Sequence, residues 1–293
     1  MCCCIELLLE TCFPCLQRRS TRAFVVLTPP GEDDIKTRLF PIHVSEQAEF
    51  DLIAVHGWKG HRENSWTSAS GINWLRDLLP KDIPKLNIYS WGYTCDRDIM
   101  GWSRSVMQIL SRRFVADLQE YRESSQGHQR PLVVIAHSVG GIMLKSTLLN
   151  SASFTESKDA TEDIKSSIQG ILYMGTREVD ASITDLEAYL ARGSRAHPAE
   201  DEYFRESSWL INTLRQYEKI SQGFRAGYGY ERGPDAGQRH VEETSNARSM
   251  YFNTTWDGMI KYDSATDPNY TQVRECILWI LKGNGEGNAN QQG

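Results

Sequence analysis

A serine with small neighbours stands between an apolar run and a helix-like segment, and this arrangement is suited to nucleophilic chemistry. Residues 131–136 (PLVVIA) form a continuous apolar run, typical of a strand buried on both faces, and Ser138 follows it closely. Ala136 and Gly140 are the small residues that a sharp strand-to-helix turn needs two positions before and after its serine. Such a nucleophile elbow would lift the Ser138 hydroxyl above the sheet. The alternative is a small-residue turn with a solvent-exposed serine.

Two backbone groups could stabilise the oxyanion formed by such a nucleophile. The N–H of Val139 begins the following helix, whose dipole points to the same place. Upstream, His56-Gly57-Trp58-Lys59-Gly60 follows a second apolar run, residues 50–55. A loop after an earlier strand supplies the second oxyanion-hole donor in serine hydrolases, and the Trp58 N–H is the candidate. We interpret the His56 side chain as a brace for this loop and not as the general base.

A serine nucleophile needs a base, usually a histidine held by an acid, and the chain order expected here is serine, acid, histidine. Two histidines follow Ser138, His197 and His240. His240 is the candidate base. Glu231, just past an expected strand, is the candidate acid, with Asp235 as the other choice. The alternatives are an exposed loop residue for His240 and a solvated charge for Glu231.

Strand-like and helix-like segments alternate along the chain and would position these groups. We expect strands at residues 23–28, 50–55, 86–91, 131–136, 168–175, 224–230 and 248–253. We expect helices at residues 73–79, 99–122, 140–149, 180–190, 203–220 and 270–281. This alternation predicts an α/β fold with a mostly parallel central sheet and helices on both faces.

Composition excludes several classes of protein. The 293 residues include 32 Lys and Arg and 38 Asp and Glu, for a net charge of −6. With 40% hydrophobic and 24% charged residues, the chain is not mainly disordered, collagen-like or coiled coil. The mild acidity argues against a nucleic-acid partner, because phosphate backbones need clustered cations. The sequence has no run of 18 apolar residues, so a transmembrane helix is not expected.

The cysteines gather at the amino terminus. Five of the seven lie in the first fifteen residues: Cys2, Cys3, Cys4, Cys12 and Cys15. A secreted disulfide framework would spread them through the fold, so we predict a reducing, intracellular compartment. The amphipathic tail has arginines behind it, a pattern suited to S-acylation at Cys2, Cys3 and Cys4 and to anchoring on a membrane surface. Metal binding is disfavoured because the tail has no histidine. A disordered leader without function is the other alternative.

Taken with these motifs, the chain resembles the lipase-like serine esterases of the α/β-hydrolase superfamily. Within it, the chain is similar to the serine-active-site-containing protein, to inositol deacylases, and most of all to fungal hydrolase domains that precede NACHT, ankyrin or tetratricopeptide regions. The resemblance covers roughly residues 23–281 and is carried by DLIAVHGWKG, SWT, NWLRDLLP, IYSWGY, RPLVVIAHSVGGIMLKSTLL, GILYMGT and DPNYTQV. It implies an α/β-hydrolase fold, acyl ester or lipid substrates, no metal or cofactor, and endoplasmic reticulum or mitochondrial membranes.

The carboxyl half departs from the family pattern. The family typically has an Asp-His pair before a Lys-Phe step, and the matching stretch here is residues 254–262, which places Trp256 at the position of the catalytic histidine. Residues 177–180 read REVD where the family carries Pro-His-Arg-Gly. Two explanations stay open. Either His240 has taken the base role from a rebuilt loop, or the triad is lost and the protein binds an acyl ligand or partner without useful turnover.

We therefore expect three parts. Residues 1–22 would be a Cys-rich, acylated tail, residues 23–282 one α/β-hydrolase domain, and residues 283–293 a disordered tail. The predicted function is a membrane-associated serine hydrolase that acts on acyl ester or lipid substrates through Ser138. The alternative is a catalytically degraded, membrane-tethered module for ligand binding or signalling.

Overall fold

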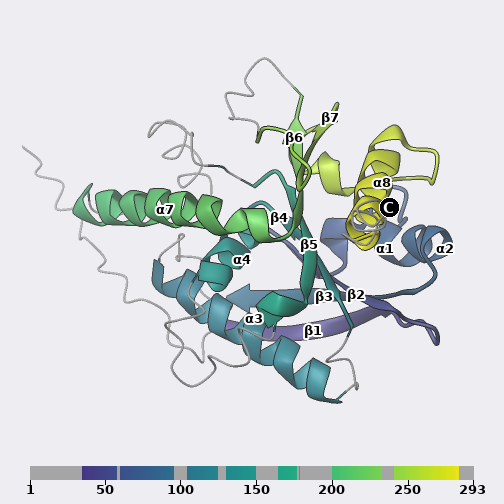
Figure 1. Ribbon diagram of the computed structural model, residues 1–293, viewed down its shortest axis with the longest axis horizontal. Helices are drawn as coiled ribbons and strands as arrows, with labels where there is room; N and C mark the ends of the chain where they lie inside the picture. The colour runs from purple at the N-terminus through teal and green to yellow at the C-terminus, as the bar shows by residue number, and fades with distance from the viewer. Residues whose placement is uncertain are drawn as a thin grey trace, which may run out of the picture.

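A seven-stranded sheet forms the centre of the protein, as the computed structural model shows (Figure 1). The structure describes residues 35–57, 60–95, 104–124, 130–149, 164–176, 178, 200–232 and 241–283. Its strands are β1 (Ile35–His43), β2 (Phe50–Val55), β3 (Leu86–Cys95), β4 (Leu132–His137), β5 (Ile168–Met174), β6 (Arg225–Glu231) and β7 (Ala247–Phe252). The helices that cover it are α1 (Trp74–Asp77), α2 (Leu79–Asp82), α3 (Arg104–Ser124), α4 (Val139–Leu149), α7 (Glu200–Ile220) and α8 (Pro268–Leu281).

The strand order is β1-β3-β2-β4-β5-β6-β7, and every neighbouring pair except β1 and β3 is parallel. The predicted mostly parallel sheet is therefore confirmed. Because β2 to β7 all run in one direction, their carboxyl ends share one edge of the sheet. Segments far apart in the sequence meet at that edge, which is where ligands bind in open α/β sheets.

The sheet separates two apolar cores, and the alternation of side chains along β4 shows how. Val134 and Ala136 face one core, while Val133 and Ile135 face the other. Helices α3, α4 and α7 cover the first face, and α1, α2 and α8 cover the second (Figure 1). All six residues of β4 are buried, which explains why its sequence reads as an unbroken apolar run.

Several element boundaries differ from the expectations. The sequence did not predict β1, whose alternation is blurred by Pro41, where the register with β3 shifts. Strand β3 continues four residues past its expected end at Trp91 and pairs with β1 over that extension. The single helix expected at residues 73–79 is two short helices, α1 and α2. The expected strand 23–28 and helix 180–190 lie outside the described residues. Within the described part, no helix has the length and apolarity to cross a membrane.

Helix α8 lies close against the sheet because two strands carry glycines beneath it. A Cβ at Gly170 on β5 would lie 2.5 Å from Ile280, and one at Gly227 on β6 would lie 2.4 Å from the sulfur of Cys276. The helix begins with an N-cap, since the Asp267 carboxylate accepts from the N–H of Asn269 at 2.8 Å. Helix and sheet are therefore held at a distance that tolerates no added methyl group.

This close packing predicts the effect of Gly170→Ala. The added methyl would also meet the Arg225 carbonyl at 2.8 Å, so strand and helix must shift. We expect a loss of about 1–3 kcal/mol in the free energy of unfolding, measured by urea titration. Gly223→Ala is the matched control, because a Cβ there has no neighbour within 4 Å. An equal loss in the free energy of unfolding of Gly170→Ala and Gly223→Ala would contradict the close packing of α8 on β5.

Candidate active site

The junction of β4 and α4 has the backbone of a nucleophile elbow. Ser138 has a φ of 54° and is the one non-glycine residue with positive φ in the part of the chain that the structure describes. A side chain in this left-handed region costs about 1–2 kcal/mol, so the surroundings must hold it there. Strand β4 ends one residue before Ser138, and α4 begins one residue after it. The sequence predicted this strand-turn-helix arrangement correctly.

Hydrogen bonds from the neighbouring strand fix the elbow. The Ser138 N–H donates to the carbonyl of Met174, the last residue of β5, at 2.8 Å. The Ser138 carbonyl accepts from the Thr176 hydroxyl and from the Gly141 N–H, both at 3.0 Å. The turn is therefore held from the end of β5 as well as from its own helix.

Three glycines allow the backbone to come this close. A Cβ at Gly140 would lie 2.6 Å from the His56 carbonyl, and one at Gly141 would lie 2.1 Å from the Thr176 hydroxyl. A Cβ at Gly57, just after β2, would lie 3.1 Å from the Cβ of Ser138. The small residues of the motif are thus required by contacts with β2 and with the segment after β5, as well as by the turn.

His56 is fully engaged in holding the chain that follows β2. Its Nδ1 donates to the Gly57 carbonyl at 2.8 Å, and its Nε2 accepts from the Tyr93 N–H at 3.4 Å. The Tyr93 ring stacks on it at 4.3 Å, and the Tyr93 hydroxyl donates to the His56 carbonyl at 3.1 Å. Burial lowers the pKa of His56 to about 4, so the ring is neutral. These contacts agree with the interpretation of His56 as a brace.

His137 is the second histidine beside the elbow, and it is tied to Trp256. Its Nε2 donates to the Trp256 carbonyl at 3.2 Å, and the two ring centroids are 4.4 Å apart. The Trp256 indole donates in turn to the carbonyl of Gly175 at 3.3 Å. Burial lowers the pKa of His137 to about 4 as well. Trp256 therefore packs at the carboxyl edge of the sheet, after β7, as part of the framework around the elbow.

The structure places some of the predicted site residues and not others. Val139 begins α4, with its N–H in the first turn of the helix. Glu231 ends β6 and pairs in register with Phe252, the last residue of β7, so it lies at the same edge as Ser138. The predicted oxyanion donor Trp58 and the predicted base His240 lie outside the described residues. So do the cysteines predicted to carry acyl chains, Cys2, Cys3 and Cys4.

The sequence reasoning missed a buried ion pair beneath the elbow. Lys145 on α4 donates to the Glu178 carboxylate at 2.5 Å, and the Lys145 side chain is fully buried. Its ammonium lies 4.7 Å from the centre of the Tyr173 ring, whose hydroxyl donates to that of Tyr217 at 2.6 Å. Burial lowers the pKa of Lys145 and raises that of Glu178, while each partner opposes the shift of the other. The pair ties α4 to the segment after β5.

The sequence does contain a signal for the positions of Thr176 and Glu178. Both follow β5 directly, and β5 is the parallel neighbour of β4. Residues just after adjacent parallel strands meet at one edge, so their contact with the elbow follows once the strand order is known. The strand order was the missing information.

Comparison with known proteins agrees with the geometry at a coarse level. No family model matches the chain. Protein SERAC1 of Mus musculus is 28% identical over 131 residues, which are 38% of this chain and 20% of that protein. Protein SERAC1 of Homo sapiens is 25% identical over 159 residues, which are 47% of this chain and 24% of that protein. The chain thus has distant homology to a small part of these relatives.

Solved structures with a similar chain path include an esterase and a lipase. A carboxylesterase structure from Nitrososphaera gargenis has a TM-score of 0.48 and 13% identity, covering 87% of this chain and 98% of the other. A soluble variant of the monoglyceride lipase from Saccharomyces cerevisiae has a TM-score of 0.48 and 11% identity, covering 85% and 91%. Both scores fall below 0.5, so the assignment of an α/β-hydrolase fold rests on the sheet order and the elbow.

The left-handed backbone predicts an unusual order of stability at Ser138. Ser138→Gly should be more stable than Ser138→Ala by about 1 kcal/mol, because glycine adopts positive φ without a Cβ clash. Urea titration of both variants measures the difference. The control is the same pair of substitutions at Ser221, in a 3-10 turn before β6, where alanine should be at least as stable as glycine. If the difference in stability between the glycine and alanine variants had the same sign at Ser138 and at Ser221, a strained backbone at Ser138 would be ruled out.

The two buried histidines predict how stability depends on pH. The native state binds a proton only near pH 4 at His56 and His137, whereas the unfolded chain does so near 6.5. Their stabilisation is therefore complete above pH 6.5 and is lost as pH falls towards 4, by up to about 1.4 kcal/mol per pH unit for each histidine. Urea titrations across this range should show a shallower loss for His56→Gln than for the wild type. Gln47→Ala, an exposed residue without a titratable side chain, is the control and should keep the wild-type slope.

Proposed function

We propose that this chain is a serine hydrolase that cleaves acyl esters through Ser138. One observation carries the proposal: a non-glycine residue is held at positive φ where the central parallel strand meets its helix. The strain is maintained by β5 and by close contacts with the chain after β2, which is the support expected of a nucleophile elbow.

The proposed reaction is acyl transfer in two steps. The Ser138 hydroxyl attacks the ester carbonyl while a base takes its proton, and the N–H groups of Val139 and Trp58 stabilise the oxyanion. The alkoxide leaving group takes a proton and departs, and water then cleaves the acyl-enzyme. The substrate we propose is an acyl ester or a lipid.

The base is proposed to be His240, with Glu231 as its acid. His56 is unsuited to the role because both of its ring nitrogens are already hydrogen-bonded. His137 donates from Nε2 to the Trp256 carbonyl, which leaves Nδ1 as its proton acceptor, but burial lowers the pKa of this ring to about 4. A histidine with so low a pKa is a weak base at neutral pH, so we assign the base to another segment. His240 stands between β6 and β7, in the chain order that the mechanism requires.

A second function is favoured by a different observation. Trp256 follows β7, where the chain order serine, acid, base places the histidine, and Ser138 is only 1% exposed. An indole has no basic nitrogen to accept the serine proton. The alternative proposal is a hydrolase-fold module that binds an acyl ligand or a partner without turnover. Membrane attachment through Cys2, Cys3 and Cys4, at the endoplasmic reticulum or mitochondria, is proposed for either form.

Labelling with a fluorophosphonate tests the enzyme. We expect stoichiometric phosphonylation of the folded wild type and none of Ser138→Ala, because the probe reacts only with an activated serine. Intact-protein mass spectrometry measures the extent. His240→Ala should slow labelling by roughly 100-fold or more if His240 is the base. Ser221→Ala, on the opposite edge of the sheet, is the matched control and should label at the wild-type rate.

The outcomes separate the two proposals. No labelling of the folded wild type would reject the hydrolase and favour the binding module. Labelling that depends on Ser138 but is unchanged in His240→Ala would keep the enzyme and reject the assigned base.

A further inference from the structure

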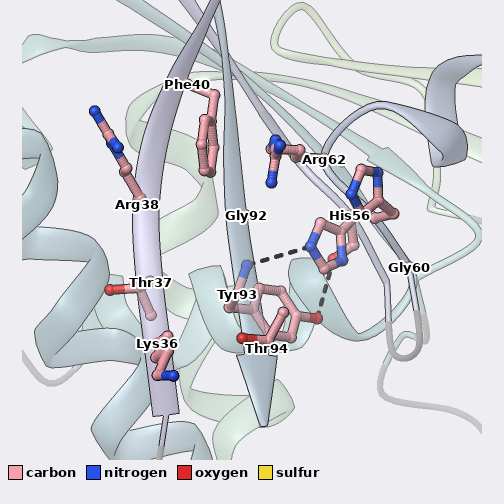
Figure 2. A pocket seen from close by; sticks show the side chains of 11 residues that line it. Lys36, Thr37, Arg38, Phe40, His56, Gly60, Arg62, Gly92, Tyr93 and Thr94 are labelled. Carbon is pink, nitrogen blue, oxygen red and sulfur yellow. Dashed lines mark hydrogen bonds between the residues drawn. The ribbon is translucent and has the colours of Figure 1, made fainter.

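A hollow of about 270 Å³ lies on β1 and β3, beside the residues that follow β2 (Figure 2). Three cationic side chains line it, Lys36, Arg38 and Arg62, and none of its described lining residues carries a carboxylate. The whole chain has a net charge of −6, so this gathering of positive charge is local. Such a concentration of like charge in a recess attracts anions.

An aromatic ring holds two of the cations in place. Phe40 stands between Arg38 and Arg62 in Figure 2, and the guanidinium carbons lie 5.5 and 3.9 Å from its ring centre. Residues Lys36, Arg38 and Phe40 alternate along β1 and so share one face of the strand. The guanidinium groups are thereby oriented without being neutralised by a bidentate carboxylate.

Arg62 brings a partly exposed guanidinium to the hollow, since its side chain is 37% exposed. Its Nε is buried and has no hydrogen-bond acceptor among the described residues. The half-exposed Glu63 carboxylate lies 3.5 Å from this Nε, which is too far for a strong hydrogen bond. An oxyanion in the hollow would therefore meet the terminal nitrogens of the guanidinium and not the Nε.

A glycine makes room for this arrangement. A Cβ at Gly92 on β3 would lie 3.1 Å from the Cβ of Arg62 and 3.2 Å from the Phe40 ring. The absence of a side chain there lets Arg62 and Phe40 pack over the strand and leaves the hollow open.

His61 adds a second donor, because its tautomer is fixed. Its Nδ1 accepts from the N–H groups of Glu63 and Asn64 at 3.2 and 3.3 Å. In the neutral ring the proton is therefore on Nε2, and the His61 ring lines the hollow. His56 forms the wall between the hollow and the elbow and uses both of its nitrogens within the chain.

Cations on an outer strand also have a simpler use, since they discourage pairing with other chains. That explanation covers Lys36 and Arg38, which are exposed on β1. It does not cover Arg62, which comes from another segment, after β2. The convergence of two segments on one recess indicates a ligand.

We propose that this hollow binds the phosphate group of a phosphorylated ligand. Arg62 would hold the oxygens, since the guanidinium fork matches phosphate geometry, and Arg38 and Lys36 on β1 would add charge. A water takes about 30 Å³, so the hollow has space for a phosphate and several further atoms against Phe40 and Tyr93. The site is distinct from the elbow and does not depend on the proposed hydrolase activity.

Calorimetric titration of the full chain with inorganic phosphate, at constant ionic strength in chloride, tests the site. We expect saturable binding of one phosphate. Arg62→Gln should weaken it by about tenfold or more, because a charge-assisted hydrogen bond is lost. Arg38→Gln, an exposed change that keeps the fold, should also weaken it. Arg76→Gln on α1 is the matched control: it removes the same charge from an arginine already paired with Asp77 and should leave the affinity unchanged.

Competition identifies the source of the phosphate. Glycerol 3-phosphate and vesicles of phosphatidylcholine with phosphatidic acid are each added to the phosphate titration. Competition by vesicles that is absent in Arg62→Gln supports a lipid headgroup; competition by glycerol 3-phosphate alone supports a soluble ligand. No saturable binding of phosphate to the wild type overturns the proposal, and so does an equal loss in Arg76→Gln. Fluorophosphonate labelling of Ser138 is expected to be the same in Arg38→Gln, which separates this site from the elbow.

Discussion

The left-handed backbone at Ser138 is the constraint on which the site depends. A serine does not hold a φ of 54° by itself, so the fold must supply the free energy. It does so through the Met174 carbonyl and the Thr176 hydroxyl at the end of β5, and through contacts that only Gly57 and Gly140 permit. The parallel sheet is what brings these three segments to one edge. The elbow is thus a property of β2, β4 and β5 together and not of one local turn.

The same crowding decides what the histidines can do. Packing at the elbow buries His56 and His137, lowers the pKa of each to about 4, and commits both nitrogens of His56 and the Nε2 of His137 to backbone groups. A histidine with a pKa near 4 is a weak proton acceptor at neutral pH. Trp256 completes the framework by accepting from His137 and donating to Gly175. The two histidines that pack beside the elbow therefore act as structural supports, and we expect the proton acceptor to come from another segment.

Sequence patterns were sufficient for the parallel sheet and the elbow, because both depend on local signals. The apolar run before Ser138 reflects burial on both faces of β4, and Gly140 reflects a close approach that no other residue allows. Strand β1 was missed because its ladder with β3 is defined by a partner far along the chain and not by its own alternation. The roles of Thr176 and Arg62 likewise depend on which strands are neighbours, and one sequence does not contain that information.

The segment after β2 has two faces with opposite chemical requirements. On one face, Gly57 approaches the Cβ of Ser138 so closely that a methyl group on Gly57 would be crowded. Position 57 therefore has no room for a side chain. On the other face, Arg62 brings a partly exposed guanidinium to the hollow beside β1, with the half-exposed Glu63 carboxylate 3.5 Å from its Nε. His56 lies between them and is neutral, so the positive charge of the hollow is separated from the elbow by an uncharged wall. Filling the hollow with an anion would engage Arg62 while leaving the hydrogen bonds of His56 intact, which is why the two sites can be tested independently.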